Sequence, residues 1–358
     1  MTSLRLLADD LTGALDTAAE LVGLVGPVPV FWHGAVPPVL PASAALDSGT
    51  RELGRPAGAA VVSGLAASLS GADIAYKKID SLLRGPTLAE LAACLRAGGW
   101  QRCVLAPAFP HQGRVTQGRR QYARNGEAGW SAVSGDMVAA LRAEGVDAQA
   151  GQLDADLLPG VSVFDAGTDD DLRRVVATAR RWPGDVLWSG SGGLAQALAS
   201  GVEAPAPRVL PLPMLGLFGS DQPATAAQLA ACAPHWIELP ASAEVGRRLA
   251  ADGVVLASVG LPHGLAREDA ARRIAAELAS LTRGMQPPGT LLAAGGETLR
   301  GLCISLGARG LEVQGRIAPG LPWSIMQGGR WDGVTVISKS GAFGHRTLLR
   351  ELISERTA

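Results

Sequence analysis

Two adjacent carboxylates, Asp9 and Asp10, stand where an apolar run, Leu4–Ala8, gives way to a helix-like stretch over Ala14–Leu24. Carboxylates in this position can accept a proton from a substrate hydroxyl, and open α/β sheets bind ligands at the carboxyl ends of their strands. A single aspartate here could simply cap the helix. Two acids followed by Thr12 and a glycine exceed what capping requires, so we interpret the turn as part of a ligand site.

A second polar segment, residues 77–86, ends another apolar strand and carries Lys78, Asp80, Ser81 and Arg84. Its ammonium and guanidinium groups can neutralise a carboxylate, and a guanidinium can do so with two parallel hydrogen bonds. Such charge-assisted hydrogen bonds contribute about 1.5–3 kcal/mol each, which is enough to select acidic substrates. A solvated charged turn, in which Asp80 caps the next helix, is an equally good interpretation of this segment alone.

A third segment, residues 106–118, is stiffened by two prolines and follows another strand. Gly113 lets the backbone approach a ligand closely, and Arg114 adds a second guanidinium for an anion. We interpret His111 in this segment as a simple loop histidine. The five histidines of the chain are scattered without the spacing of metal ligands, which argues against a histidine metal site.

Three glycine-rich turns follow apolar strands in the second half of the chain, at residues 218–221, 294–298 and 339–344. Free backbone N–H groups and the positive end of a helix dipole can bind phosphate at such turns. Each turn alone is more often a plain connection, but three in one domain, one of them beside Lys339, could surround a nucleotide's phosphates. The chain lacks a Walker-type phosphate loop, the protein-kinase signatures and the dinucleotide fingerprint after its first strand.

Short apolar runs alternate with helix-like stretches such as Thr87–Arg96 and Asp170–Arg181, a pattern typical of parallel sheets with crossover helices. We expect strands at Leu4–Ala8, Val28–Trp32, Ile74–Ile79, Cys103–Ala106, Val161–Phe164, Val186–Trp188, Leu215–Phe218, Val254–Ser258, Thr290–Ala293 and Val334–Ser338. Four prolines within Ala204–Pro213 favour an extended connector. The sequence therefore predicts two α/β domains, residues 1–203 and 214–358, each with a largely parallel sheet flanked by helices and joined by residues 204–213.

Composition and charge restrict the class of protein further. The 358 residues exceed the size of one core, and 47% hydrophobic against 18% charged residues excludes a disordered chain. The 32 basic and 33 acidic residues are mixed along the chain, so no basic stripe could follow a nucleic acid, and no apolar run approaches the roughly 20 residues of a membrane span. The N-terminus resembles no secretion signal, and four cysteines lie in apolar stretches without paired spacing. We therefore expect a cytoplasmic protein with reduced core cysteines, and neither nucleic acid nor membrane as a partner.

In order and over nearly the whole chain, these segments resemble the four-carbon acid sugar kinase family. In the first half the resemblance rests on an Asp-Asp-x-Thr-Gly turn at 9–13, a Lys-x-x-Asp-Ser segment ending in Arg-Gly at 77–85, a Pro-Ala-Phe-Pro segment ending in Gly-Arg-x-Thr at 107–116, and a glycine-rich turn at 190–194. In the second half it rests on Gly-Ser at 219–220, Gly-Gly-x-Thr at 295–298, Pro-Gly-x-Pro at 319–322 and Lys-Ser-Gly-x-Phe-Gly at 339–344. Each motif is common by itself, but the shared order and spacing are specific.

The resemblance implies a kinase that transfers phosphate from ATP to the terminal hydroxyl of a small sugar acid, a tetronate or 3-oxo-tetronate, with the active site in the cleft between the domains. It implies Mg²⁺ at the phosphates, with ligands left open, and a base for which we expect Asp10 or, failing that, Asp9. The implied acid-binding residues are Asp9, Asp10, Thr12, Lys78, Asp80, Ser81, Arg84, Gly113 and Arg114. The implied ATP-binding residues are Ser220, Gly295, Gly296, Glu297, Thr298, Lys339, Gly341 and Gly344.

Some positions depart from the family pattern. Leu82 and Pro86 stand where the family usually has a hydroxyl and an amide, and Asp221 and Gln222 replace small residues near the implied phosphates. A kinase of a branched or five-carbon acid, of the 3-oxo-isoapionate type, and a non-catalytic sugar-acid and nucleotide sensor therefore stay open as alternatives. An aspartyl-phosphate phosphatase is disfavoured because no aspartate stands two residues after either acid. The oligomeric state, a homodimer included, is also left open.

Overall fold

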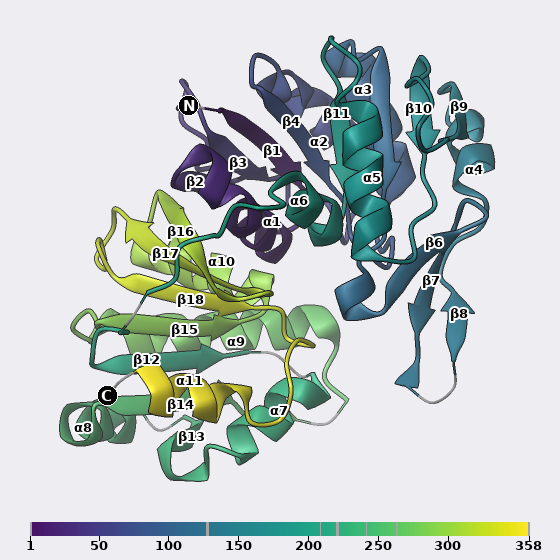
Figure 1. Cartoon of the computed structure of the whole chain (residues 1–358). Coiled ribbons are helices and arrows are strands. Elements are labelled where there is room, and N and C mark those ends of the chain that lie inside the picture. The colour runs from purple at the N-terminus through teal and green to yellow at the C-terminus, as the bar shows by residue number, and fades with distance from the viewer. Residues whose placement is uncertain are drawn as a thin grey trace. The chain divides into compact units, whose positions relative to one another are not determined.

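The computed structural model describes residues 2–126, 129–207, 209–219, 222–240, 242–262 and 264–356. The chain folds into two compact units, Met1–Ala204 and Pro205–Ala358, and each is described by itself (Figure 1). We call them unit 1 and unit 2.

Unit 1 is built on a sheet of parallel strands. Their spatial order is β2 (Val28–Trp32), β3 (Ala44–Asp47), β1 (Leu4–Ala8), β4 (Ile74–Lys78), β11 (Leu187–Gly190), β5 (Arg102–Ala106), β10 (Gly160–Val163) and β9 (Ala148–Ala150). The central strands read as continuous apolar runs because helices cover both faces of a parallel sheet. From β1 the chain builds β2 and β3 on one side and then crosses to β4 on the other, so β1 lies at a topological switch point, where ligands bind.

Helices form a layer on each face of the unit 1 sheet. The helices α1 (Leu11–Val25), α5 (Asp169–Ala179) and α6 (Gly192–Leu198) pack together on one face, and α2 (Arg55–Leu65), α3 (Thr87–Gly98) and α4 (Met137–Ala143) on the other (Figure 1). Buried Leu7, Val62, Leu91 and Leu105 belong to the core between the sheet and the second layer. A separate antiparallel arm consists of β6 (Arg114–Gln117), β7 (Arg120–Arg124) and β8 (Trp130–Ala132).

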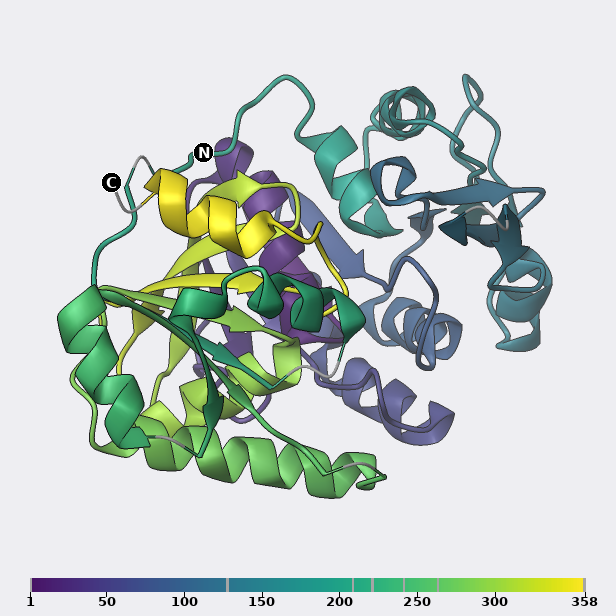
Figure 2. The ribbon, with the colours of Figure 1, turned by 90° about the horizontal axis from the view of Figure 1, so that it is seen from below.

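Unit 2 has a mixed sheet. The parallel strands β13 (Trp236–Leu239), β14 (Val254–Val259), β12 (Met214–Phe218), β15 (Thr290–Ala294) and β18 (Thr335–Lys339) are followed by the antiparallel strands β17 (Leu321–Gln327) and β16 (Gly310–Ala318). The helices α7 (Pro223–Ala230) and α11 (Leu348–Arg356) lie on one face, with α9 (Arg267–Arg283) and α10 (Gly296–Leu306) on the other, as Figure 2 shows in green and yellow. The remaining helix, α8 (Ser242–Asp252), packs beside β14.

The predicted fold class is confirmed, since both units combine a largely parallel sheet with flanking helices. Each expected strand is present, with ends displaced by at most two residues. Strands β3, β6, β7, β8, β9, β13, β16 and β17 have no counterpart among the expected strands. For β3 the reason is that it is short and half alanine, which carries little β propensity. The four cysteines are buried and unpaired, and no described helix has the length and apolar character needed to cross a bilayer.

Candidate active site

Asp9 and Asp10 occupy different environments at the end of β1. Asp10 is the N-cap of α1, and its Oδ1 accepts a hydrogen bond from the Gly13 N–H at 2.9 Å. Helix α1 therefore begins at Leu11, three residues before the start at Ala14 that we expected from the sequence. The Asp9 side chain is 5% exposed, so the pair does not consist of one helix cap and one surface carboxylate.

Arg51 binds both carboxylates and has no place among the residues expected from the sequence. Its Nε and Nη2 donate to the two Asp9 oxygens at 2.8 Å each, and its Nη1 donates to Asp10 Oδ2 at 2.5 Å. The same guanidinium lies 3.6 Å from Asp80 Oδ1. The loop after β3 supplies Arg51, and its backbone is attached to β1 because Thr50 N and Arg51 N both donate to the Asp9 carbonyl. The signal that could have revealed Arg51 is the weak strand β3, which pairs with β1 and ends just before this loop.

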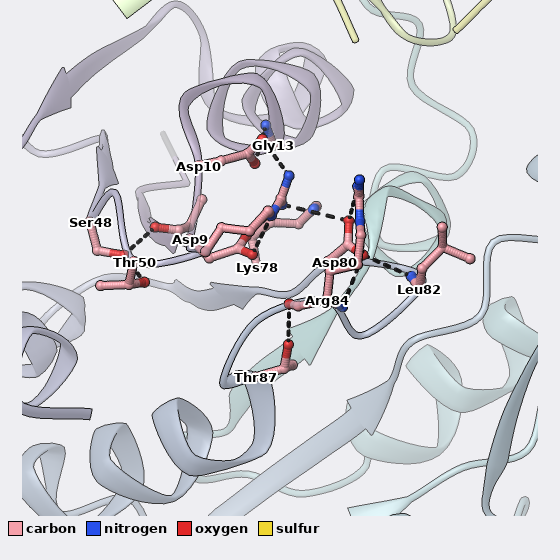
Figure 3. Close-up of polar contacts among 12 residues, drawn as sticks. Asp9, Asp10, Gly13, Ser48, Thr50, Lys78, Asp80, Leu82, Arg84 and Thr87 are labelled. Carbon is pink, nitrogen blue, oxygen red and sulfur yellow. Dashed lines mark hydrogen bonds and ion pairs between the residues drawn. The ribbon is translucent and has the colours of Figure 1, made fainter. Parts of the chain in front are cut away.

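Asp80 organises the loop that follows β4. Its carboxylate accepts hydrogen bonds from the Leu82 and Arg84 backbone N–H groups at 3.1 and 3.2 Å, and from Arg84 Nε and Nη2 at 2.9 and 2.7 Å. The N-cap position of α3 is Pro86, so Asp80 does not cap that helix. Figure 3 shows Asp9, Asp10, Lys78, Asp80 and Arg84 with their side chains gathered at the ends of β1 and β4.

The glycine of the Arg-Gly pair has a steric role. Gly85 has a φ of +79°, and a Cβ at this residue would lie 2.6 Å from the Arg51 carbonyl oxygen. A side chain would therefore clash with the Arg51 backbone, and only glycine also adopts this φ without strain. The loops after β3 and β4 consequently pack directly against each other.

The local charges move the pKa values of the aspartates apart. Burial acts to raise the pKa of Asp9, but the charge and hydrogen bonds of Arg51, with Lys78 and Lys77, outweigh it and hold that pKa below its ordinary value. Burial also raises the pKa of Asp10, and because Asp9 adds its negative charge, the pKa of Asp10 stays above the ordinary value. The pKa of Asp80 is held well below its ordinary range, since Arg84 and Arg51 overcome its burial. Neighbouring acids with separated pKa values are typical of sites where one group accepts a proton.

Two cations in this region lack a carboxylate partner within ion-pair distance among the described residues. Lys78 is 7% exposed, and its Nζ would lie 3.0 Å from a Cβ on Gly13, so the ammonium sits at the start of α1. Arg114 Nε is buried without a hydrogen-bond partner in the described part of the chain. Burial lowers the pKa of Arg114 although the nearby Asp80 charge acts to raise it. The region thus contains a buried ammonium and a half-buried guanidinium that can accept an anionic ligand.

The remaining residues expected in unit 1 lie close to this set. Thr12 is buried in the first turn of α1. The Ser81 carbonyl accepts a hydrogen bond from Gln121 Nε2 at 2.9 Å, and the same nitrogen donates to the Pro107 carbonyl, so the arm connects the loops after β4 and β5. Gly113, with a φ of +68°, directly precedes Arg114 at the start of β6.

Asp16, on α1, is a further titratable residue that the sequence did not single out. Part of its surface is exposed, but Oδ1 is shielded from solvent and has no hydrogen-bond partner among the described residues. Burial raises the pKa of Asp16 to about 7; Asp10 and Glu20 add to this effect, whereas Lys78 and Arg51 oppose it.

In unit 2 the three glycine-rich turns lie at one edge of the sheet. The parallel register aligns Phe218 with Ala294 and Ala294 with Lys339, so the turns after β12, β15 and β18 are neighbours. The Gly295 N–H donates to the Lys339 carbonyl at 2.9 Å. A Cβ on Gly219 would lie 2.7 Å from Thr298 Oγ1, which shows how closely two of the turns approach.

The residues expected to bind ATP fall into three groups. Gly295, with a φ of +94°, is the N-cap of α10, and Gly296, Glu297 and Thr298 form its first turn, where the helix dipole and backbone N–H groups favour a phosphate. Lys339 is buried and directed into the protein, with Gly341 and Gly344 in the loop after it. Ser220 lies outside the described residues.

The described residues were also compared with what a metal ion requires. They contain no group of three or more His, Cys, Asp or Glu side chains placed to hold a metal. Asp9 and Asp10 bind Arg51, so their charges are already matched by a guanidinium. Mg²⁺ in phosphotransfer sites takes one or two carboxylates and is otherwise held by waters and phosphates, so a protein-built cage is not required.

Comparison with known proteins finds two domain models that match this chain. Residues 4–143 match the model of a sugar-binding N-terminal domain, and residues 247–349 match that of a nucleotide-binding C-terminal domain. A D-threonate kinase from Cupriavidus necator is 33% identical over 76% of this chain and 78% of its own length. A D-threonate kinase from Bordetella bronchiseptica is 29% identical over 96% of this chain and 95% of its own. This chain belongs to the four-carbon acid sugar kinase family.

The family fold is also seen in a solved structure. A crystal structure from Salmonella typhimurium LT2, described as that of a proposed tRNA synthase, is 20% identical over all of both chains, with a TM-score of 0.75. At this identity the similarity concerns the fold alone. The residues matched by the sugar-binding domain model include Asp9, Arg51, Asp80 and Arg114, and those matched by the nucleotide-binding domain model include the turns from Gly295 to Gly344.

Proposed function

We propose that this chain is an ATP-dependent kinase that phosphorylates the terminal hydroxyl of a four-carbon sugar acid, a tetronate or 3-oxo-tetronate. The observation that carries the proposal is the pairing, in unit 1, of two cations without a described carboxylate partner, buried Lys78 and half-buried Arg114, with two carboxylates whose pKa values are separated. The names of the D-threonate kinases that it resembles support the same substrate class.

In this proposal Lys78 and Arg114 bind the substrate carboxylate. Both lie in surroundings that raise the cost of leaving a charge unmatched, so an incoming carboxylate is stabilised more than it would be at the surface. Arg84 already uses Nε and Nη2 on Asp80. Arg84 therefore contributes chiefly by holding the loop after β4, and its side chain, 59% exposed, borders the site.

Asp10 is the group that we assign as the proton acceptor. Its raised pKa makes it a better base than Asp9, whose pKa is held low by two hydrogen bonds from Arg51. A positioned base contributes about 10²- to 10⁴-fold to such a transfer, and most of the remaining acceleration comes from positioning and charge neutralisation. Asp9 then acts through Arg51, which it holds against Asp10.

The nucleotide is assigned to unit 2, at the edge formed by the three glycine-rich turns. The first turn of α10 offers backbone N–H groups, and the absence of side chains at the glycines allows close approach of phosphates. Mg²⁺ bound with the nucleotide would neutralise phosphate charge, held mainly by the phosphates and water.

The test is the substitution Asp10→Asn. Asparagine keeps a capping oxygen for the Gly13 N–H, so helix α1 stays intact while the base is lost. We expect kcat for D-threonate to fall about 10²- to 10⁴-fold with ADP affinity unchanged. The matched control is Asp136→Asn, because Asp136 caps α4 in the same manner away from the site, and this variant should keep full activity.

Two results would contradict the proposal at different levels. An Asp10→Asn variant with near wild-type kcat would remove Asp10 as the base and leave the reaction class standing. A wild-type chain that releases no ADP with D-threonate, D-erythronate, a 3-oxo-tetronate or five-carbon sugar acids would refute the kinase function itself.

A further inference from the structure

Lys339 has surroundings that do not suit a direct phosphate ligand. Its side chain is 1% exposed, and Nζ lies 2.9 Å from the Ser340 carbonyl, 3.4 Å from that of Gly341 and 3.2 Å from that of Phe343. It also donates to Thr225 Oγ1 at 3.2 Å. The ammonium is thus surrounded by oxygens of its own loop, and no described carboxylate forms an ion pair with it.

Helix α7 supplies the rest of this inward attachment. Thr225 Oγ1 donates to the Gly341 carbonyl at 2.7 Å, and Gln228 Nε2 donates to the carbonyls of Phe343 and His345 at 3.0 and 3.1 Å. Thr225 and Gln228 are both fully buried and stand three residues apart, so they share one face of α7. Together with Lys339 they hold the loop by its carbonyl oxygens.

The direction of the carbonyls determines the direction of the amide N–H groups. In a trans peptide the C=O and the following N–H point to opposite sides of the chain. The carbonyls of Ser340, Gly341 and Phe343 point toward Lys339, so the N–H groups of the residues that follow them, Gly341, Ala342 and Gly344, point away from it. These three N–H groups donate no hydrogen bond to any residue that the structure describes. Successive outward N–H groups form an anion-binding nest.

We propose that Lys339 is a positioning residue, which, with Thr225 and Gln228, turns the carbonyls of the loop after β18 inward so that the N–H groups of Gly341, Ala342 and Gly344 bind phosphate oxygens of the nucleotide. This inference rests on the proposed kinase function. Lys339 acts through the loop and through its positive charge, without touching the nucleotide. Gly344 is required by the same arrangement, because its φ is +95° and a Cβ there would lie 2.9 Å from Gln228 Nε2 and 2.3 Å from Leu348.

The decisive experiment measures nucleotide affinity in variants that alter the loop attachment without approaching the ligand. Isothermal titration with ADP, on the full chain and without any sugar acid, would compare Lys339→Met, Thr225→Val and Gln228→Met. We expect a loss of about 10- to 100-fold for Lys339→Met, where charge-assisted bonds are removed, and about 3- to 10-fold for Thr225→Val. The control is Thr282→Val, which removes a buried threonine hydroxyl that bonds the Leu278 carbonyl within α9.

A second readout separates loop positioning from direct phosphate binding. ADP should slow hydrogen exchange in a peptide spanning residues 340–346 of the wild type, and Thr225→Val should weaken that protection as well as the affinity. If Lys339→Met alone reduces affinity while Thr225→Val and Gln228→Met behave like Thr282→Val, Lys339 is a direct ligand and the inference is overturned. Unchanged affinity in all three variants overturns the inference and leaves the kinase function intact. If the wild type binds neither ADP nor ATP, both proposals fail.

Discussion

The substitution Arg51→Met tests whether unit 1 depends on one guanidinium to hold two carboxylates together. Arg51 is 15% exposed, gives Asp9 two hydrogen bonds and binds Asp10 at 2.5 Å. Methionine fills a similar volume but leaves buried Asp9 and half-buried Asp10 without their cation. Removing one partner of a buried ion pair costs about 3–5 kcal/mol, which is a large part of the about 5–15 kcal/mol that stabilises a typical domain.

The pH dependence of this loss follows from the pKa directions. In the wild type the pKa of Asp9 is below its ordinary value, so its contribution to stability is present at neutral pH and is lost as the pH falls through that low pKa. Without Arg51, burial raises the pKa of both acids, and the folded state takes up a proton. Stability of the variant then falls as the pH rises from about 4 toward neutrality. The difference between wild type and Arg51→Met should therefore be smaller near pH 4.5 than near pH 8, where it reaches its full value.

The measurement is urea unfolding at these two pH values. Unfolding is monitored by hydrogen exchange in peptides that span β1 and α1, because these peptides report on unit 1 alone. The control is Arg174→Met, which breaks an exposed pair with Asp154 at 2.8 Å and should leave stability near that of the wild type at both pH values. If Arg51→Met resembles this control at pH 8, the two carboxylates are not held by Arg51, and the assignment of separate pKa values to them fails.

Two further predictions concern α1. Gly13→Ala would place a Cβ 2.5 Å from Asp10 Oδ1, so we expect a loss of about 1 kcal/mol in unfolding free energy together with reduced kcat. The control is Gly64→Ala, at an open position in α2, which should stabilise the protein by up to about 1 kcal/mol. Equal effects of the two alanines would contradict this reasoning. Asp16→Asn should raise stability at pH 8 and not at pH 4. Burial raises the pKa of Asp16 from 3.8 to about 7, so the wild-type folded state loses stability as the pH rises from about 4 to about 7. At about 1.4 kcal/mol per pKa unit the upper bound is about 4 kcal/mol, and partial exposure reduces the expected gain to about 1–2 kcal/mol; a gain that is the same at both pH values would argue against the assigned pKa.

The sequence predicts the elements of this fold well where apolar strands are bounded by polar turns. Asp9, Asp80 and Gly295 were all placed at strand ends, and the structure puts them there. Arg51 escaped notice because β3 is four residues long and rich in alanine, so nothing in the local pattern marks its end as a sheet edge. Arg51 reaches Asp9 because β3 lies next to β1. The order of strands depends on the whole sheet and cannot be deduced from the residues around Arg51.

The direction of a side chain at a strand end is a second feature that the sequence does not supply. Lys339 was expected among the ATP ligands because it precedes a glycine-rich turn. In the structure its ammonium bonds four oxygens within unit 2. A lysine next to Gly-rich sequence can face a ligand or support the loop from beneath, and only the partners provided by α7 distinguish the two arrangements.

The family departures in the loop after β4 differ in how they can affect specificity. Pro86 is buried, and its Cγ would lie 2.7 Å from a Cβ on Gly58, so this residue packs against α2. Leu82 is half-buried, while its backbone N–H is held by Asp80. The charges of the site are fixed by Asp80 and Arg51 whichever side chain stands at 82. A change at Leu82 therefore alters the shape and polarity beside those charges without moving them, which makes it the better candidate for selecting among sugar acids.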